Sequence, residues 1–260
     1  ADSHERWQAL VARLRGADGD DQTSAAGALA QQVRADESLR APIAAAGALP
    51  LLVALLRSAH SVAPGIASIA LVEFAKDTDL TQPIVDAGAV PALVALLRVG
   101  TDVGKSRSAC AIAWLSVEAS RHTLVLAEGA LPPLVALLRS GSEEGKPNAA
   151  CAVGWLSLDT PTQLLIVDAG ALPVLVDFLS PSHAYSLLIP GQGACLTLQH
   201  LTTNRRLRVL AMEHGAAGVL AVAAHASGCE WADSARAALR ALCPTQGDAE
   251  RALGDTHLVI

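Results

Sequence analysis

The 260-residue sequence has few aromatic residues and no apolar stretch long enough for a membrane helix. Phe, Trp and Tyr together make up 3% of the residues, although 52% are hydrophobic. The strongly apolar stretch 41–56 contains Gly47 and Pro50, whereas a membrane-spanning helix needs about 20 consecutive apolar residues. We therefore expect no membrane span, and the sequence stays compatible with a lipid anchor upstream of Ala1.

The cysteines and the basic residues also lack the spacing of known site types. The five cysteines are odd in number and include no Cys-x-x-Cys pair, which argues against a disulfide framework and a structural zinc site. We expect a reducing compartment, hence an intracellular protein, cytoplasmic or nuclear, without a cofactor. The net charge is −6 and the basic residues are scattered, so we expect no nucleic-acid partner.

What the sequence does contain is an internal repeat. The tetrapeptide Gly-Ala-Leu-Pro, or Gly-Ala-Val-Pro, begins at Gly47, Gly88, Gly129 and Gly170, at intervals of 41 residues. A period in this range is typical of stacked supersecondary units, each of which buries its apolar face against its neighbours. Such arrays bind other molecules more often than they catalyse reactions, and we expect no enzymatic activity.

One unit of this repeat, 88–128, predicts three helices. Residues 89–98 are apolar on most sides and carry Pro91 in the first turn, where the missing N–H costs nothing. A polar loop over 99–104 precedes a second helix over 106–117, and a short third helix over 122–127 ends just before Gly129. A glycine there permits the sharp turn into the next unit.

Two pairs of segments resemble the armadillo repeat family. The stretches 84–94 and 166–176 read Ile-Val-Asp-Ala-Gly-Ala-Val/Leu-Pro, and 111–116 and 152–157 share Trp-Leu-Ser. HEAT repeats, the nearest competing family, lack the junction glycine. The resemblance implies an all-α fold, a right-handed α-α superhelix in which one helix of every unit lines a concave groove.

The repeat predicts a single domain over 1–260 with about six units and degenerate end units. Their approximate bounds are 1–46, 47–87, 88–128, 129–169, 170–214 and 215–260. The fifth unit is four residues longer than the others, and the extra length falls in 180–193 around His183 and Tyr185. Long loops are often functional, so this segment is a second candidate surface.

The resemblance also implies which residues would contact a partner. In the family an asparagine on each groove helix binds the partner's backbone, with a tryptophan one turn earlier. The equivalent positions here hold neither residue and are Glu73, Trp114, Trp155 and His200, preceded by Ile69, Cys110, Cys151 and Leu196. We therefore expect recognition through side chains, with the two tryptophans as anchors and with Arg107 and Asn148 at the rim. Partner binding has an alternative for each set of residues. The tryptophans could simply fill space between adjacent helices, and the polar residues could simply be solvated.

Three patterns suggest chemistry but do not support it. The segment 100–106 reads Gly-Thr-Asp-Val-Gly-Lys-Ser, one residue shorter than a phosphate-binding loop and placed after a helix instead of a strand. Asp86, Glu128 and Asp168 recur with the repeat, whereas a catalytic carboxylate pair needs two contrasting environments. His225 and Cys229 have no further ligands near them in the sequence.

The sequence therefore predicts a non-enzymatic adaptor that binds a protein or peptide segment in the concave groove. One alternative is a scaffold subunit that uses its convex or end surfaces within a larger complex. Another is the substrate-recognition region of a longer protein, such as a ubiquitin ligase, in which the resemblance places such arrays.

Overall fold

The computed structural model describes residues 3–180, 190–225 and 232–245, and every regular element in those ranges is a helix. The chain forms two compact units, Ala1–Pro133 and Leu134–Ile260. The predicted loop residues His183 and Tyr185, Cys229 and the tail 251–260 lie outside the described residues. The prediction of one domain over 1–260 stays a prediction.

Unit 1 is built from nine α-helices, two short 3-10 helices and the start of a tenth α-helix. They are α1 (Ser3–Leu14), α2 (Gly19–Ala35), η1 (Glu37–Leu39), α3 (Arg40–Ala45), α4 (Ala48–Leu56), α5 (Ala63–Ala75), α6 (Thr78–Asp86), α7 (Ala89–Val99), α8 (Asp102–Leu115), η2 (Ala119–Arg121), α9 (His122–Ala127) and the beginning of α10 (Leu131–Ser140).

Unit 2 contains the rest of α10 and seven further described helices. These are α11 (Gly145–Leu156), α12 (Thr160–Asp168), α13 (Ala171–Phe178), α14 (Pro190–Leu201), α15 (Arg205–Glu213), α16 (Ala216–His225) and α17 (Ala232–Leu242).

The helices follow the predicted three-helix repeat. Counted from the short helix that precedes the left-handed glycine, the first helix of a repeat is, for example, α6, the second is the apolar α7 and the third is the long α8. The glycine separates the first helix from the second. The glycines with positive φ are Gly47, Gly88, Gly129, Gly170 and Gly215, with φ between 72° and 84°. Only glycine adopts this conformation without strain. The chain bends there by 88° between α3 and α4 and by 82° between α6 and α7 in unit 1, and by 84° and 79° at the corresponding places in unit 2.

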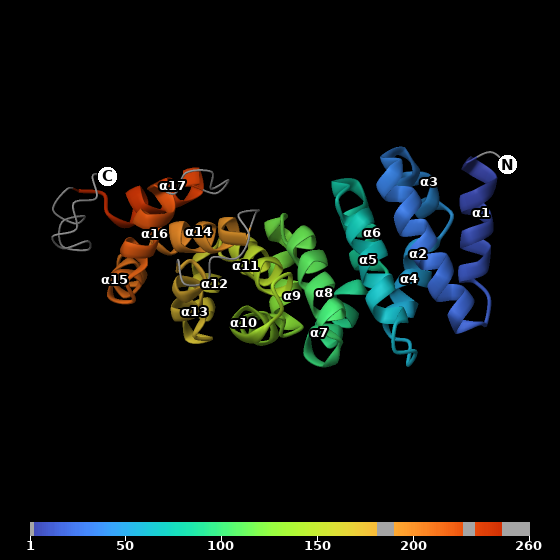
Figure 1. Cartoon of the computed structure of the whole chain (residues 1–260), viewed down its shortest axis with the longest axis horizontal. Coiled ribbons are helices and arrows are strands. Elements are labelled where there is room, and N and C mark those ends of the chain that lie inside the picture. Colours follow the sequence, from blue (N-terminus) through green and yellow to red (C-terminus); the bar gives the residue numbers. More distant parts are fainter. Residues whose placement is uncertain (1–2, 181–189, 226–231, 246–260) are drawn as a thin grey trace. The chain divides into compact units, whose positions relative to one another are not determined.

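The third helices of successive repeats pack side by side within each unit. In unit 1, α5 lies between α2 and α8, and in unit 2, α14 lies between α11 and α17 (Figure 1). We call the side of α2, α5 and α8 that carries Trp114 the third-helix face of unit 1. The side of α11, α14 and α17 that carries Trp155 is the third-helix face of unit 2.

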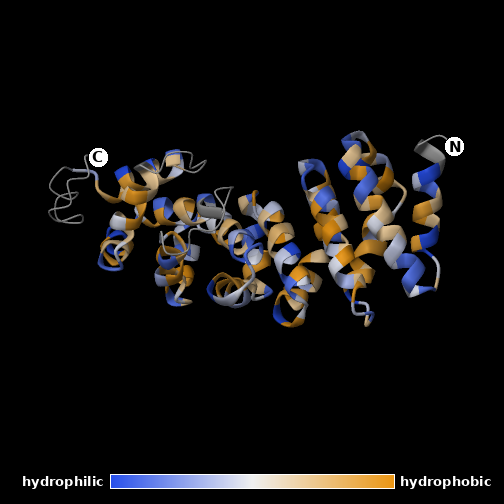
Figure 2. Cartoon of the chain, in the orientation of Figure 1, coloured by the Kyte–Doolittle hydropathy of each residue, from blue (hydrophilic) through white to orange (hydrophobic). Residues whose placement is uncertain are grey.

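The core consists mostly of Ala, Val and Leu side chains that project from all three helix types, and α4 and α7 are hydrophobic on most sides (Figure 2). Small residues let the third helices approach closely. A Cβ atom added to Gly154 of α11 would lie 2.8 Å from the carbonyl oxygen of Gly193 in α14. The absence of side chains at these two positions therefore allows backbone contact between α11 and α14.

One predicted boundary was wrong. Helix α8 begins at Asp102 and not at 106, because the hydroxyl of Thr101 accepts a hydrogen bond from Gly104 N and caps the helix four residues earlier. Most of the segment that resembles a phosphate-binding loop is therefore helical. Similarly, α14 begins at Pro190, inside the predicted loop 180–193.

A row of arginines, which the sequence had not indicated, connects the end of a second helix to the next repeat. Each guanidinium lies beside the junction glycine of the following repeat. The last backbone carbonyls of the short first helix need hydrogen-bond donors there. The hydrogen bonds are Arg15 to Ala46 O (2.7 Å), Arg57 to Gly88 O (2.9 Å) and Arg98 to Glu128 O (2.9 Å). Arg139 lies near Gly170 in the same way, whereas Gly215 has no side chain within 4 Å of its Cβ position. The residue one period after Arg139 is Ser180.

Within residues 3–180, 190–225 and 232–245, no single helix is long and apolar enough to cross a membrane, although five bent pairs of neighbouring helices reach that length and composition together.

The arginine row makes a stability prediction. Arg98→Gln should lower the free energy of unfolding by about 0.5–1 kcal/mol, because it removes a charged donor from the carbonyl end of α9. Urea unfolding followed by circular dichroism measures this change. Arg206→Gln is the matched control, since Arg206 is exposed on α15 and its side chain has no hydrogen bond to a described residue; equal losses in both variants would contradict the structural role of Arg98.

Candidate functional site

The structure places every predicted contact residue on a third helix. Glu73 lies on α5, and Arg107, Cys110 and Trp114 lie on α8, all in unit 1. The other four are in unit 2: Asn148, Cys151 and Trp155 on α11, and His200 on α14. The repeat period thus identified equivalent positions on neighbouring helices.

Trp114 reaches the surface of unit 1. Its residue is 37% exposed, although Ala113 and Leu115 on either side are buried. Its indole also lies beside Cys110, one turn earlier on α8, and acts to lower the pKa of that thiol. Trp155 in unit 2 is half-buried. Packing therefore uses part of each ring, and at Trp114 a substantial part remains for a partner.

Cys110 and Cys151 are half-buried beside the tryptophans, and both are reduced thiols. Burial raises the pKa of Cys110, and the nearby positive charges of Arg107 and Lys76 reduce this effect without reversing it. The thiolate is the reactive form of cysteine, so Cys110 offers a protonated, weakly polar surface. Arg107 and Asn148 are half-buried as well, and their place at the rim stays a prediction.

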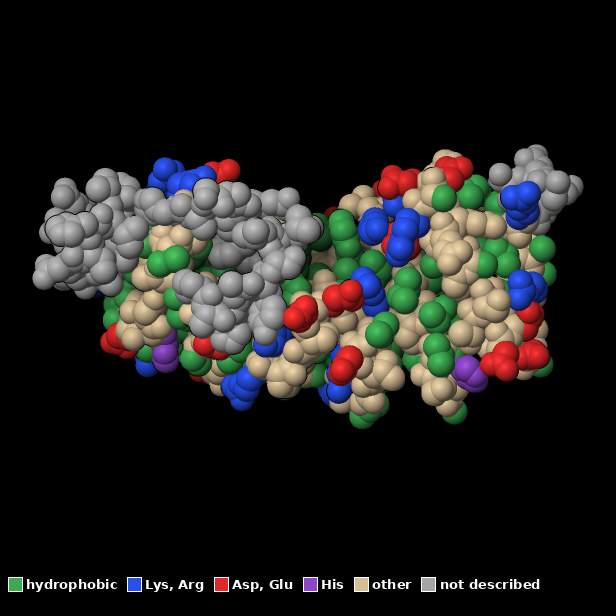
Figure 3. Space-filling view, in the orientation of Figure 1, with side chains coloured by type: hydrophobic (Ala, Val, Ile, Leu, Met, Phe, Trp, Pro, Cys, Tyr) green, Lys and Arg blue, Asp and Glu red, His purple; other side chains and the backbone are tan. Residues whose placement is uncertain are grey.

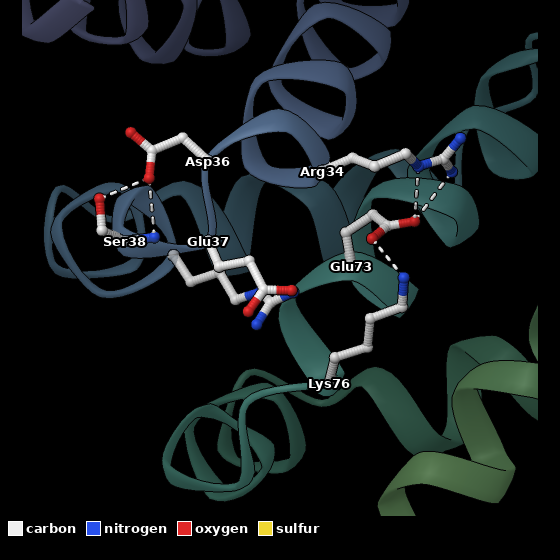
Figure 4. Close-up of polar contacts among 7 residues, drawn as sticks. Arg34, Asp36, Glu37, Ser38, Glu73 and Lys76 are labelled. Atoms are coloured by element: carbon white, nitrogen blue, oxygen red, sulfur yellow. Dashed lines mark hydrogen bonds and ion pairs between the residues drawn. The ribbon is translucent and has the colours of Figure 1, made fainter.

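Glu73 is not on an exposed helix face, as the sequence had suggested, but is 2% exposed. Its Oε1 accepts hydrogen bonds from Nε (3.0 Å) and Nη2 (2.8 Å) of Arg34, and its Oε2 accepts one from Nζ of Lys76 at 2.6 Å (Figure 4). Arg34 comes from α2, and Lys76 is the C-cap of α5. A buried carboxylate is tolerated only with such partners, and they explain why a glutamate occupies this position.

The two cations decide the ionisation of Glu73. Burial alone would raise its pKa, but the hydrogen bonds and positive charges of Lys76 and Arg34 outweigh burial and lower the pKa below the usual value of 4.5. Glu73 is therefore ionised at neutral pH, and Arg34, Glu73 and Lys76 form a charge triad with one excess positive charge.

His200 occupies the corresponding position in unit 2, in a different environment. Its Nδ1 lies 2.7 Å from Oγ of Ser157, whose hydroxyl donates to Gly154 O at 2.7 Å. Since that hydroxyl proton is used, Nδ1–H of His200 is the donor. Burial lowers the pKa of His200, against a smaller opposite effect of the nearby Gly154 backbone. Ser157 is 0% exposed, so this pair has no accessible nucleophile.

One further candidate, Gln32 on α2, was missed. It lies 41 residues before Glu73 and occupies the same repeat position in the degenerate first unit. The period itself could have found it, had the count been continued upstream of Gly47. Its Oε1 is buried and has no hydrogen-bond partner among the described residues. The position therefore holds an amide in the first repeat, a carboxylate in the second and an indole in the third.

The described ranges contain no group of three or more His, Cys, Asp or Glu residues that could hold a metal ion. The accessible chemistry of the two faces consists of indole rings, thiols, an imidazole and the charge triad, all of which suit recognition of another polypeptide.

No protein-family model and no curated protein sequence matches this chain. Several solved structures do. An engineered protein superposes with a TM-score of 0.83 at 27% identity, over 92% of this chain and 99% of its own. Computationally designed armadillo repeat proteins for modular peptide recognition give a TM-score of 0.79 at 27% identity, over 89% and 98%. A designed armadillo repeat protein in complex with the peptide (KR)4 gives 0.77 at 26% identity, over 90% and 98%.

Glu73 gives a pH-dependent prediction. Because its pKa is lower in the folded chain than in the unfolded chain, its contribution to stability is complete above pH 4.5 and is lost as the pH falls through the folded value. Glu73→Gln should therefore cost about 1–2 kcal/mol at pH 7, and the difference from wild type should shrink at pH 3. Glu143→Gln, at an exposed site in unit 2, should change stability by less than about 0.5 kcal/mol at both pH values.

His200 gives a second pH-dependent prediction, in a higher range. Its pKa is lowered by folding, so its contribution is complete above pH 6.5 and decreases as the pH falls. The wild-type chain should thus lose more stability between pH 7.5 and 5.5 than His200→Gln does, as measured by urea unfolding at each pH. Parallel losses in the two proteins would show that His200 titrates normally.

Proposed function

We propose that this chain, which has the armadillo repeat fold, is a non-enzymatic adaptor that binds an extended segment of a partner protein on its third-helix faces. The observation that carries the proposal is the partial exposure of Trp114 in a chain with only four tryptophans. The exposure of a large apolar ring to water, 37% here, is unfavourable in free energy. A partner that covers the ring removes that unfavourable contribution. Tryptophan is also strongly enriched among the residues that dominate binding energy.

The mode of binding follows from the residues at the repeat position. An amide at this position in every unit could hold a partner's backbone regardless of its sequence. Here the third helices carry an amide, a carboxylate, an indole, a second indole and an imidazole, at Gln32, Glu73, Trp114, Trp155 and His200. We propose recognition through the partner's side chains, which makes binding sequence-selective.

The comparisons support the class of partner. Two of the similar structures are described by peptide recognition or by a bound peptide, (KR)4. The chemistry of this chain differs from what such a basic peptide would need in unit 1, because Glu73 is already neutralised by Arg34 and Lys76. We therefore propose a peptide-like segment as the partner, with a different side-chain preference.

A scaffold role is the second candidate, and one feature of unit 2 favours it. Leu164 and Leu165 on α12 and Val209 on α15 are 44–49% exposed. Exposed apolar residues on first helices, away from the third-helix face, are expected where a larger complex covers them. A depression of about 630 Å³ lies next to Val209, lined by α15 and the preceding Asn204.

A peptide selection separates the two roles. Linear peptides selected on the wild-type chain from a displayed library should bind Trp114→Ala at least about tenfold more weakly, because the variant removes the central apolar anchor. Val99→Ala, at an 86% exposed site on α7, is the matched control and should change the Kd less than twofold. Fluorescence polarisation of the labelled peptides gives these values.

A different result would support the scaffold role instead. Peptides that retain their affinity for Trp114→Ala and Trp155→Ala but lose it in the double variant Leu164→Gln, Leu165→Gln would establish binding at α12 and refute the adaptor proposal.

A further inference from the structure

We infer that the third-helix face of unit 1 selects a partner segment with an acidic residue two or four positions from an apolar one: Arg34 and Lys76 bind the Asp or Glu carboxylate, and Trp114 contacts the apolar side chain. This inference rests on the proposed function and names the chemistry of the partner. It is carried by the donors that Arg34 and Lys76 leave unused and by the position of Trp114 on the adjacent helix.

Arg34 presents half of its guanidinium to a partner. Its Nε and Nη2 both donate to Oε1 of Glu73, and Nη1 donates to no described residue. The side chain is 62% exposed. The edge formed by Nη1 and Nη2 therefore remains for a second carboxylate, which a guanidinium binds with two parallel hydrogen bonds. Glu73 fixes the plane of the group in advance, so a partner loses less side-chain entropy on binding.

Lys76 is held by the other oxygen of the same carboxylate. Its Nζ donates to Oε2 of Glu73, one of three possible donations, and its side chain is 36% exposed. Two cations thus share one carboxylate and repel each other across it. A further carboxylate between them relieves this repulsion. Lys and Arg side chains gather around an acidic side chain over the end of α5 on the side of unit 1 shown in Figure 3.

The acidic residues that follow Arg34 and Lys76 in the chain do not supply that second carboxylate. Asp36 points away from Glu73 and accepts from N and Oγ of Ser38 (Figure 4). Glu37 accepts from Nη2 of Arg40 at 3.0 Å. Asp77, next to Lys76 in the chain, accepts from Asp79 N and caps α6. These carboxylates serve local helix starts and ion pairs, which leaves the triad with its excess positive charge.

Trp114 sets the distance to the apolar side chain. It occupies on α8 the position that Glu73 occupies on α5, and the two helices pack against each other. Packed helix axes lie about 8–10 Å apart, and an extended chain advances about 3.3 Å per residue with alternate side chains on one side. The acidic and apolar residues of the partner are therefore two or four positions apart.

Synthetic peptides test this preference directly. The probe is an eight-residue peptide with Glu at positions one and three, Leu at positions five and seven, and Ser at the others, together with its reversed sequence. The controls replace both Glu by Gln or by Lys. At low ionic strength the better-binding Glu peptide should have a Kd about five- to tenfold lower than its Gln analogue and lower still than its Lys analogue. The advantage should fall in about 1 M salt.

Variants assign the effect to the triad. In Arg34→Gln and in Lys76→Gln the Glu peptide should bind about as weakly as the Gln peptide. The double variant Arg34→Gln, Glu73→Gln removes a cation together with its buried partner, and it tests the same loss in a chain without an unpaired carboxylate. Arg13→Gln is the matched control: Arg13 is 41% exposed and pairs with Asp21, but it lies on α1, so the Glu preference should persist. Melting curves check that each variant is folded.

Equal affinities for the Glu and Gln peptides would overturn the inference, as would a Glu preference that survives in both Arg34→Gln and Lys76→Gln. Absence of binding by every peptide at 1 mM would overturn it as well. None of these results would decide the proposed function, which depends on the library selection and on Trp114→Ala.

Discussion

The fold depends on a backbone conformation that recurs every repeat: a glycine with φ between 72° and 84° between the first and second helices. A side chain at φ near +80° is strained in any other residue, so the turn requires glycine and bends the chain by about 80–90° in the measured pairs. This bend lets the three helices of one repeat pack against one another. Within each unit, the third helices of neighbouring repeats then pack side by side and place equivalent residues on one face.

That arrangement separates stability from recognition. The apolar second helices and the arginines that follow them hold consecutive repeats together, as at Arg57 and Gly88. The fold consequently does not fix the residue type at one position on each third helix, and the local environment decides which side chain can stand there. In unit 1 this tolerance is electrostatic, because a glutamate at the position is stable only between Arg34 and Lys76. In unit 2 a neutral imidazole fits there, since Nδ1 of His200 lies within hydrogen-bond distance of Oγ of Ser157 and burial lowers the pKa of the ring.

The sequence predicted the repeat, the three-helix unit and the helices that carry the candidate residues. The required glycines and their spacing of 41 residues can be read directly from the sequence. It did not predict the burial of Glu73. Arg34 lies 39 residues earlier on another helix, and no local pattern indicates that their side chains meet. The arginine row was missed for the same reason. Its hydrogen bonds reach carbonyl groups about 30 residues away, whereas the periodicity of hydrophobic residues reports only which side of a helix is buried.

The two departures from prediction have a common physical origin. Each concerns a cation whose partner belongs to another helix, and in each the kind of acceptor determines the role of the cation. Arg98 directs Nη2 to two backbone carbonyls and is therefore a structural residue, although it is exposed. Arg34 uses one edge on Glu73 and keeps the other. Exposure alone would rank these two arginines as equivalent, whereas their acceptors distinguish them: Arg98 donates to backbone carbonyls of the next repeat, and Arg34 donates to a side chain that it shares with Lys76.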